Sequence, residues 1–280
     1  MSGQTIAATA AFLLGLALTA GAARAATPHE AAVGAQLEQL CDARSLGVVG
    51  RFAKVAHFAE PPLGQAPDAN AVIAASACQS APALHARLVA VAYLGELPDT
   101  RSLIVVAIDS RSGQVTSAWR GTLDEDAATR IVSGSLWLDT GAYDLQPDLR
   151  AFGLDVTSGA RPDCADTGTG ARRTLFVSHG RFIQPVLQGL PMSEWTVLQR
   201  GRSWCTDSSA PEQSIIENVS ATLALAPGTT NGFRDLAITA SATRDDGQKT
   251  ARAPLRRILK FDGRSYLLNE LQVAWAAWRQ

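Results

Sequence analysis

The sequence lacks the short motifs that mark the common enzyme and cofactor classes. It contains no G-x-S-x-G turn, no S-x-x-K pair, no H-E-x-x-H helix and no phosphate-cradling glycine loop. The four histidines are scattered at His29, His57, His85 and His179, and none stands at ligand spacing from a cysteine. We therefore expect neither a cofactor nor a metal site.

Basic residues are not in surplus. Lys and Arg together number 25 against 26 Asp and Glu, so the formal net charge is −1. A nucleic-acid-binding protein needs a positive surplus to neutralise phosphates, so nucleic acid is a poor partner for this chain. The acidic runs at residues 124–126 and 245–246 lack the alternating oxygen ligands of a calcium loop. We interpret them as solvated turns.

Long apolar runs are missing except near the N-terminus. Residues 6–18 form an apolar stretch that is short for a bilayer span, and an Ala-x-Ala pattern follows at 23–25. This pattern predicts an export signal over residues 1–25, with cleavage before Ala26. We expect no transmembrane span after cleavage and a periplasmic or secreted product.

The four cysteines suit an exported protein. They are well separated and include no C-x-x-C pair, which argues against a metal site. Three pairings are possible, and sequential pairing closes the two shortest loops. We therefore expect disulfides between Cys41 and Cys78 and between Cys164 and Cys205, each contributing about 2–4 kcal/mol to stability.

The rest of the chain predicts mainly β structure. Residues 28–44 have the apolar spacing and the terminal residues of one N-terminal helix. Apolar or alternating runs of strand length, separated by turn residues, occupy 88–94, 103–108, 115–119, 129–138, 150–157, 174–177, 182–187, 194–199, 214–226, 233–243, 255–261 and 264–268. This pattern favours an antiparallel sandwich, an open barrel or a partial propeller.

A polar stretch divides the β region. Residues 158–171 are rich in Gly, Asp and Thr and predict a surface loop or a linker. The predicted organisation is a signal peptide (1–25), an N-terminal helix plus β region (26–157), this loop or linker, and a C-terminal β region (172–280). Two questions stay open: whether the β regions form one domain or two, and whether the tail 269–280 is a helix or a strand.

Four stretches resemble a group of uncharacterised exported proteins of Gram-negative bacteria. They are YDLQPDLRAFGLDVTS (143–158), RTLFVSHGRFIQPVL (173–187), NGFRDLAITA (231–240) and LKFDGRSYLL (259–268). The group has no established activity. The resemblance therefore implies export and a β-rich structure, and it implies no particular chemistry.

One stretch resembles the catalytic loop of an aspartic protease. Residues 136–142 read Leu-Trp-Leu-Asp-Thr-Gly-Ala, and Asp-Thr-Gly recurs at 166–168. Such enzymes hold two carboxylates that share one proton. The second copy lacks a preceding apolar strand, and the later apolar-apolar-Gly strand of the family is not evident. We interpret residues 139–142 as a turn and keep Asp139 as the one candidate catalytic residue.

Tryptophan offers another kind of site. The six tryptophans are Trp119, Trp137, Trp195, Trp204, Trp275 and Trp278. Large aromatic side chains in β proteins usually pack in the core, and we expect Trp204 to pack on the disulfide of Cys205. Trp275 and Trp278 stand three residues apart and are the pair that we expect to be exposed for stacking on a glycan.

The leading hypothesis is an exported, disulfide-stabilised β-rich protein that binds a protein or glycan of the cell envelope without catalysing a reaction. It rests on the N-terminal signal pattern, on the cysteines and on the lack of a catalytic constellation. The alternative hypothesis is a hydrolase, similar to an aspartic protease, that uses Asp139.

Overall fold

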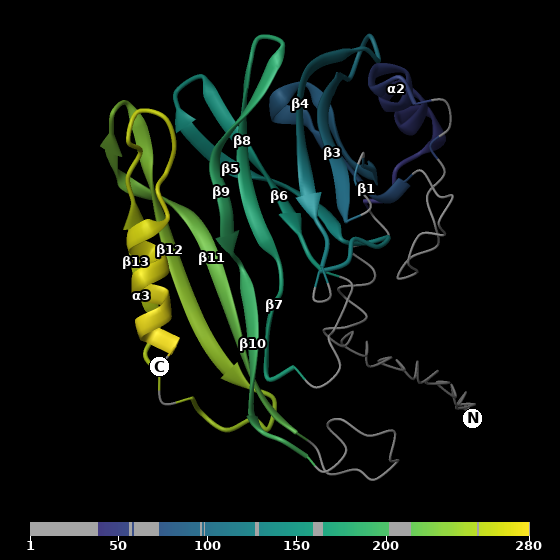
Figure 1. The fold of residues 1–280 in the computed structure, drawn as a ribbon. Helices are drawn as coiled ribbons and strands as arrows, with labels where there is room; N and C mark the ends of the chain where they lie inside the picture. The colour runs from purple at the N-terminus through teal and green to yellow at the C-terminus, as the bar shows by residue number, and fades with distance from the viewer. Residues whose placement is uncertain are drawn as a thin grey trace, which may run out of the picture.

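The computed structural model shows a mainly β protein, which confirms the predicted fold class (Figure 1). It describes residues 39–55, 58, 73–95, 97, 99–126, 129–158, 165–201, 214–250 and 252–279. The described residues form two sheets, of which the larger is nearly closed, as in the predicted open barrel. Several predictions concern residues outside this description. They are the export signal, most of the predicted N-terminal helix, and His29, His57, Cys164, Cys205 and Trp204.

The first described helix begins where the predicted helix was expected to end. Residues 40–42 are not helical, and helix α2 spans Ala43–Ala53. The side chain of Asp42 accepts a hydrogen bond from the Ser45 N–H at 2.7 Å, and this N-cap starts the helix. Leu46 and Val49 are its buried apolar residues. The expected helix end at residue 44 is therefore wrong, because Asp42 is a start signal.

The larger sheet has eight strands in the order β1-β2-β3-β4-β9-β8-β6-β5. The strands are β1 (Ile73–Ala81), β2 (Ala86–Leu94), β3 (Thr100–Asp109), β4 (Val115–Asp124), β5 (Leu136–Gln146), β6 (Leu149–Val156), β8 (Arg172–His179) and β9 (Phe182–Pro191). Neighbouring strands are antiparallel, except that β4 and β9 are parallel through the single pair Ala118 and Phe182. The sheet takes strands from both sides of residues 158–171, so the two halves of the sequence share it.

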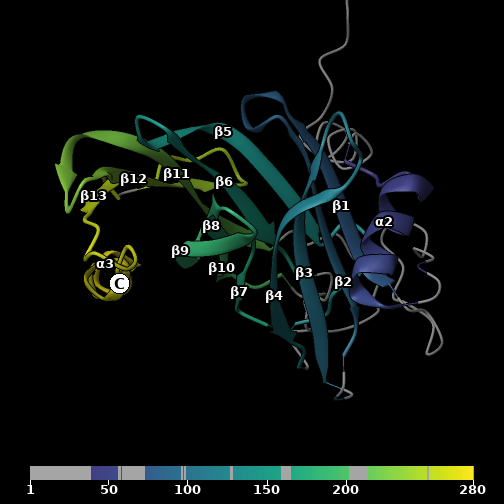
Figure 2. The same ribbon diagram turned by 90° about the horizontal axis from the view of Figure 1, so that it is seen from above.

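One residue, Gln39, bridges the two outer strands of this sheet. β1 and β5 are its edges, yet they lie side by side (Figure 2). The backbone oxygen of Gln39 accepts from the Cys78 N–H of β1 at 2.8 Å. The Gln39 carboxamide donates to the Leu138 carbonyl of β5 and accepts from its N–H, both at 2.7 Å. Gln39, only 4% exposed, therefore substitutes for a strand between β1 and β5.

A disulfide holds this bridge in place. Cys41 and Cys78 are bonded, which confirms the first of the two predicted pairs. Cys41 follows Gln39 by two residues, so the bond ties the segment that carries Gln39 to β1. The closure of the sheet therefore has a covalent link to β1 and a hydrogen-bonded link to β5.

The smaller sheet has five strands in the order β13-β12-β11-β10-β7. They are β7 (Thr167–Thr169), β10 (Ser193–Gln199), β11 (Ile215–Thr230), β12 (Phe233–Arg244) and β13 (Leu255–Leu259). Two segments bend from one sheet into the other, since β7 leads into β8 and β9 into β10. Backbone bonds from Gly170 to Ser193 and from Met192 to Ala171, both 2.8 Å, continue the pairing round the corner.

Three apolar clusters fill the layers. One lies between α2 and the outer face of the larger sheet, and a second, rich in alanine, lies inside the barrel-like curve. The third packs β5, β6, β8 and β9 against the smaller sheet and helix α3 (Asn269–Arg279). The tail is thus a helix, and Figure 1 shows it alongside β13. Its buried Leu271 and Trp275 stand four residues apart, on one helical face.

We expect the double variant Cys41→Ser/Cys78→Ser to lose about 4 kcal/mol of unfolding free energy, the loop-entropy value for this sequence separation of 37. Urea denaturation of the oxidised proteins measures the loss. With a reducing agent present, wild type and variant should unfold at the same urea concentration. An oxidised variant as stable as the wild type would contradict the role of the bond.

Candidate functional site

Asp139 lies inside a strand and not in the predicted turn. β5 continues to Gln146, and residues 140–142 form a bulge between the pairs Asp139–Gly153 and Tyr143–Ala151. The Asp139 carboxylate does accept a local hydrogen bond from the Gly141 N–H at 2.8 Å, as in an Asx turn. The turn prediction is wrong because buried Tyr143, four residues beyond Asp139, continues the strand into the core.

Arg173 of β8 connects the polar groups around Asp139. Its Nε and Nη2 donate to the two carboxylate oxygens of Asp155 on β6, at 2.7 and 2.8 Å. Its Nη1 lies 2.5 Å from Asp139 Oδ2 and donates to the Tyr143 hydroxyl at 2.8 Å. Tyr143 in turn donates to Asp139 Oδ2 at 2.8 Å. The Arg173 side chain is 10% exposed, so the cluster is largely shielded from water.

The cluster shifts the pKa of two of its members. Burial, opposed by the Arg173 cation and reinforced by the hydrogen bond to Asp139, raises the pKa of Tyr143 to about 12. Burial alone would lower the pKa of Arg173, but the hydrogen bonds and charge of Asp155, with the charge of Asp139, raise it. Tyr143 is therefore neutral and Arg173 charged at neutral pH. Neither can exchange protons there as a general acid or base must.

This arrangement differs from the proton-sharing pair of an aspartic protease. Such a pair needs two carboxylates in direct hydrogen-bond contact. Here a guanidinium stands between Asp139 and Asp155 and binds both. Asp166, from the second Asp-Thr-Gly, is bound to Arg200 at an exposed position of the smaller sheet. The geometry thus gives Asp139 a structural role, joining β5 to β8.

The described residues offer no metal centre. They contain no group of three His, Cys, Asp or Glu side chains placed to hold an ion. His85 ends the short 3-10 turn between β1 and β2, and His179 ends β8, so they lie in different connections.

The two tryptophans that we expected to be exposed both contact neighbouring residues of the fold. Trp275 is 5% exposed and donates to Glu194 of β10 at 2.9 Å. Trp278 is half-buried, donates to the Ala253 carbonyl at 2.7 Å and lies beneath the Arg252 guanidinium. The expectation of an exposed stacking pair is wrong, because the helix that carries them turns this face toward the smaller sheet.

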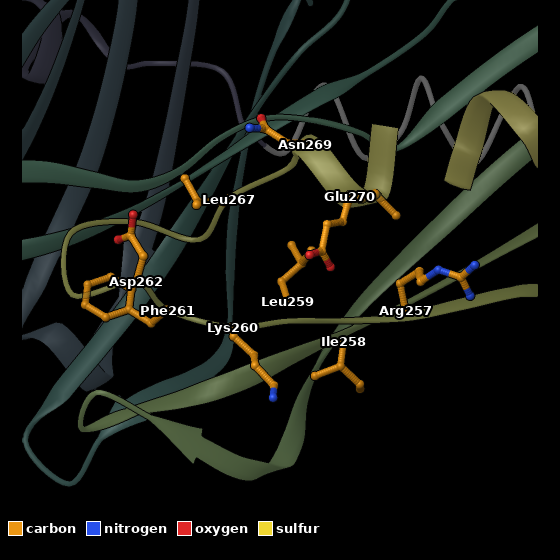
Figure 3. A pocket seen from close by; sticks show the side chains of 10 residues that line it. Arg257, Ile258, Leu259, Lys260, Phe261, Asp262, Leu267, Asn269 and Glu270 are labelled. Atoms are coloured by element: carbon orange, nitrogen blue, oxygen red, sulfur yellow. The ribbon is translucent and has the colours of Figure 1, made fainter. Parts of the chain in front are cut away.

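An open groove lies between β13 and the start of α3 (Figure 3). We call it the β13 groove; its volume is about 500 Å³ and its lining comes from residues 257–262, 267 and 269–271. Figure 3 shows Leu259 and Glu270 pointing toward each other, whereas Ile258 and Lys260 point away from Glu270. Ile258 is 51% and Leu267 52% exposed, so the groove presents apolar surface to solvent.

Four cations lie around the β13 groove, which also has Glu270 in its lining. Arg256, Arg257, Lys260 and Arg264 are all exposed, and no ion pair is formed by these four within the described residues. Asp262 is engaged in the turn, where it accepts from the Arg264 and Ser265 N–H groups at 2.7 Å. The groove therefore combines exposed apolar side chains with a positive rim.

Sequence reasoning missed this groove. Its signal was the run Leu-Arg-Arg-Ile-Leu-Lys at 255–260, a local positive cluster in a chain of nearly balanced charge. The run predicted a strand, but it could not show that α3 would lie beside that strand. The groove is therefore a product of tertiary structure.

Comparison with known proteins finds no matching family model, no similar curated protein and no similar solved structure. Among the residues that the structure describes, no helix has the length and apolar character needed to cross a membrane. The roles of the Asp139 cluster and the β13 groove therefore rest on their own geometry.

We expect Arg173→Leu to lower the free energy of unfolding by about 3–5 kcal/mol, because two partly buried carboxylates lose their cation. Urea denaturation measures the loss. The exposed pair of Arg200 with Asp166 provides the control, and Arg200→Ala should shift the urea midpoint far less than Arg173→Leu does, because solvent screens an exposed ion pair. Equal losses in the two variants would show that the Arg173 cluster is not a structural centre.

Proposed function

We propose that this protein is exported and acts in the cell envelope as a binding protein, and that it holds an extended segment of another envelope protein in the β13 groove. The signal pattern of residues 1–25 and the Cys41–Cys78 disulfide support an oxidising compartment outside the cytoplasm. The groove supports binding. Asp139 is paired with Arg173, so its cluster gives no support to hydrolysis.

The observation that carries the proposal is the position of the groove along a sheet edge. β13 is the last strand of the smaller sheet, and no described strand pairs with its outer side. Such an edge can accept an extended peptide as an added strand, with main-chain hydrogen bonds supplying affinity. Side chains of an added strand alternate between two faces. One set would meet the exposed Ile258 and the other the exposed Leu267.

The charges around the groove indicate the composition of the segment. Arg256, Arg257 and Lys260 favour acidic side chains beside the apolar ones, through charge complementarity. Charges on an edge strand can also serve only to prevent aggregation. That explanation accounts for the three cations, but it does not account for Ile258 and Leu267, whose exposure would promote aggregation.

A binding assay with short synthetic peptides tests the proposal. We expect extended peptides with one large apolar residue between acidic residues to bind, as measured by fluorescence anisotropy, and peptides with Lys in place of the acidic residues not to bind. Ile258→Asp and Leu267→Asp should each weaken binding at least tenfold, or about 1.4 kcal/mol.

Phe182→Asp is the matched control, because Phe182 is an exposed apolar residue on β9, in the other sheet. It should leave the affinity unchanged. The proposal fails if no acidic peptide binds, or if Phe182→Asp weakens binding as much as the two groove variants do.

A further inference from the structure

The outer face of the smaller sheet carries two parallel rows of small polar side chains. Along β11 and β12, alternate residues such as Val219, Ala221, Leu236 and Ile238 are buried in the core, so the intervening residues lie on the opposite face. We call six of them the hydroxyl face: Asn218, Ser220 and Thr222 of β11, opposite Thr243, Ser241 and Thr239 of β12.

On β11 and β12 this face carries no charge; Arg256 and Ile258 of β13, paired with Thr239 and Ala237, form its margin. The next opposed pair beyond Thr222 and Thr239 is Ala224 and Ala237, so eight consecutive outward positions on the two strands carry no ionisable group. A solvated sheet face needs polar side chains, but it does not need to exclude charge. Small side chains also have few rotamers to lose, so a rigid ligand could bind here at a low entropic cost.

The hydroxyl groups of this face are weakly engaged with one another. The Ser220 and Ser241 oxygens are 3.5 Å apart. The Thr222 hydroxyl lies 3.4 Å from the Thr239 carbonyl oxygen, and that of Thr243 lies 3.5 Å from the Asn218 carbonyl oxygen. Strong O–H···O bonds are about 2.7–2.8 Å long. These groups therefore keep most of their capacity to donate to and accept from a ligand.

An aromatic ring borders the hydroxyl face. Trp195 of β10 is paired with Asn218, and its neighbours Glu194 and Thr196 bind Trp275 and Arg279 of α3 on the inner side. Trp195 therefore lies on the outer side. Its indole covers Gly168 of β7, where an added Cβ would come within 2.3 Å of the ring. The glycine is required for this close approach.

We propose that the hydroxyl face, together with Trp195, binds a neutral polysaccharide. Each Ser, Thr or Asn side chain can both donate and accept a hydrogen bond, as a sugar hydroxyl does. An indole provides apolar surface for the C–H face of a sugar ring. An anionic ligand would require cations, and a protein partner would favour exposed apolar side chains; the six positions carry neither, and Arg256 and Ile258 lie only at the β13 margin of the face. The face shares no residue with the β13 groove.

Affinity electrophoresis of the full chain tests this proposal. The probes are four neutral polymers cast into native gels: a soluble glucan, a mannan, a galactan and a soluble, fully acetylated chitin derivative. At least one should retard the protein, and Ser220→Ala/Ser241→Ala and Trp195→Ala should each weaken that binding at least tenfold. The serine variant keeps the test decisive if Trp195→Ala misfolds, since Ser220 and Ser241 make only long contacts.

Thr116→Val is the control, because Thr116 is an exposed β4 hydroxyl on the other sheet. It should bind as the wild type does. The proposal is overturned if none of the four probes retards the wild type, if the double serine variant binds unchanged, or if only anionic vesicles or acidic peptides bind. Ile258→Asp and Leu267→Asp should impair peptide binding but not polysaccharide binding, which separates failure of this proposal from failure of the first.

Discussion

The bridge made by Gln39 is the interaction on which the larger sheet depends. Without it, β1 and β5 would be two unprotected edges, each with unpaired backbone groups. The Gln39 carboxamide satisfies both the N–H and the carbonyl of Leu138, while its own carbonyl binds β1. A buried amide that lost these partners would be left unsatisfied, which is costly. The closure of the sheet therefore depends on the Gln39 carboxamide, and the buried carboxamide depends on that closure for its hydrogen-bond partners.

The position of β5 connects this closure to the rest of the molecule. Leu138 packs inside the barrel-like curve, and the next residue, Asp139, binds Arg173 on the other face of the sheet. Further along the same strand, Tyr143 and Leu145 pack in the core shared with the smaller sheet and α3. That core buries Leu271 and so sets α3 beside β13, where the groove forms. The proposed binding surfaces thus depend on contacts that begin with β5.

The sequence was informative where local chemistry decides the outcome. Most strand runs and the Cys41–Cys78 pair follow from local pattern or from a short loop. It failed at Asp139, where a turn-like sequence is held in a strand by buried neighbours, and at Trp275, whose partner Glu194 is 81 residues away. The bridge from Gln39 to Leu138 spans 99 residues. Contacts at such separations leave no local signature in one sequence.

Amide hydrogen exchange at Leu138 tests the closure most directly. The wild-type Leu138 amide should exchange slowly, because its N–H is bound to the buried Gln39 carboxamide. In Gln39→Ala, with the disulfide intact, this amide should exchange at least tenfold faster, while amides such as Val105 of the buried β3 centre stay slow. If Leu138 exchanges equally slowly in Gln39→Ala, or rapidly in the wild type, Gln39 does not close the sheet.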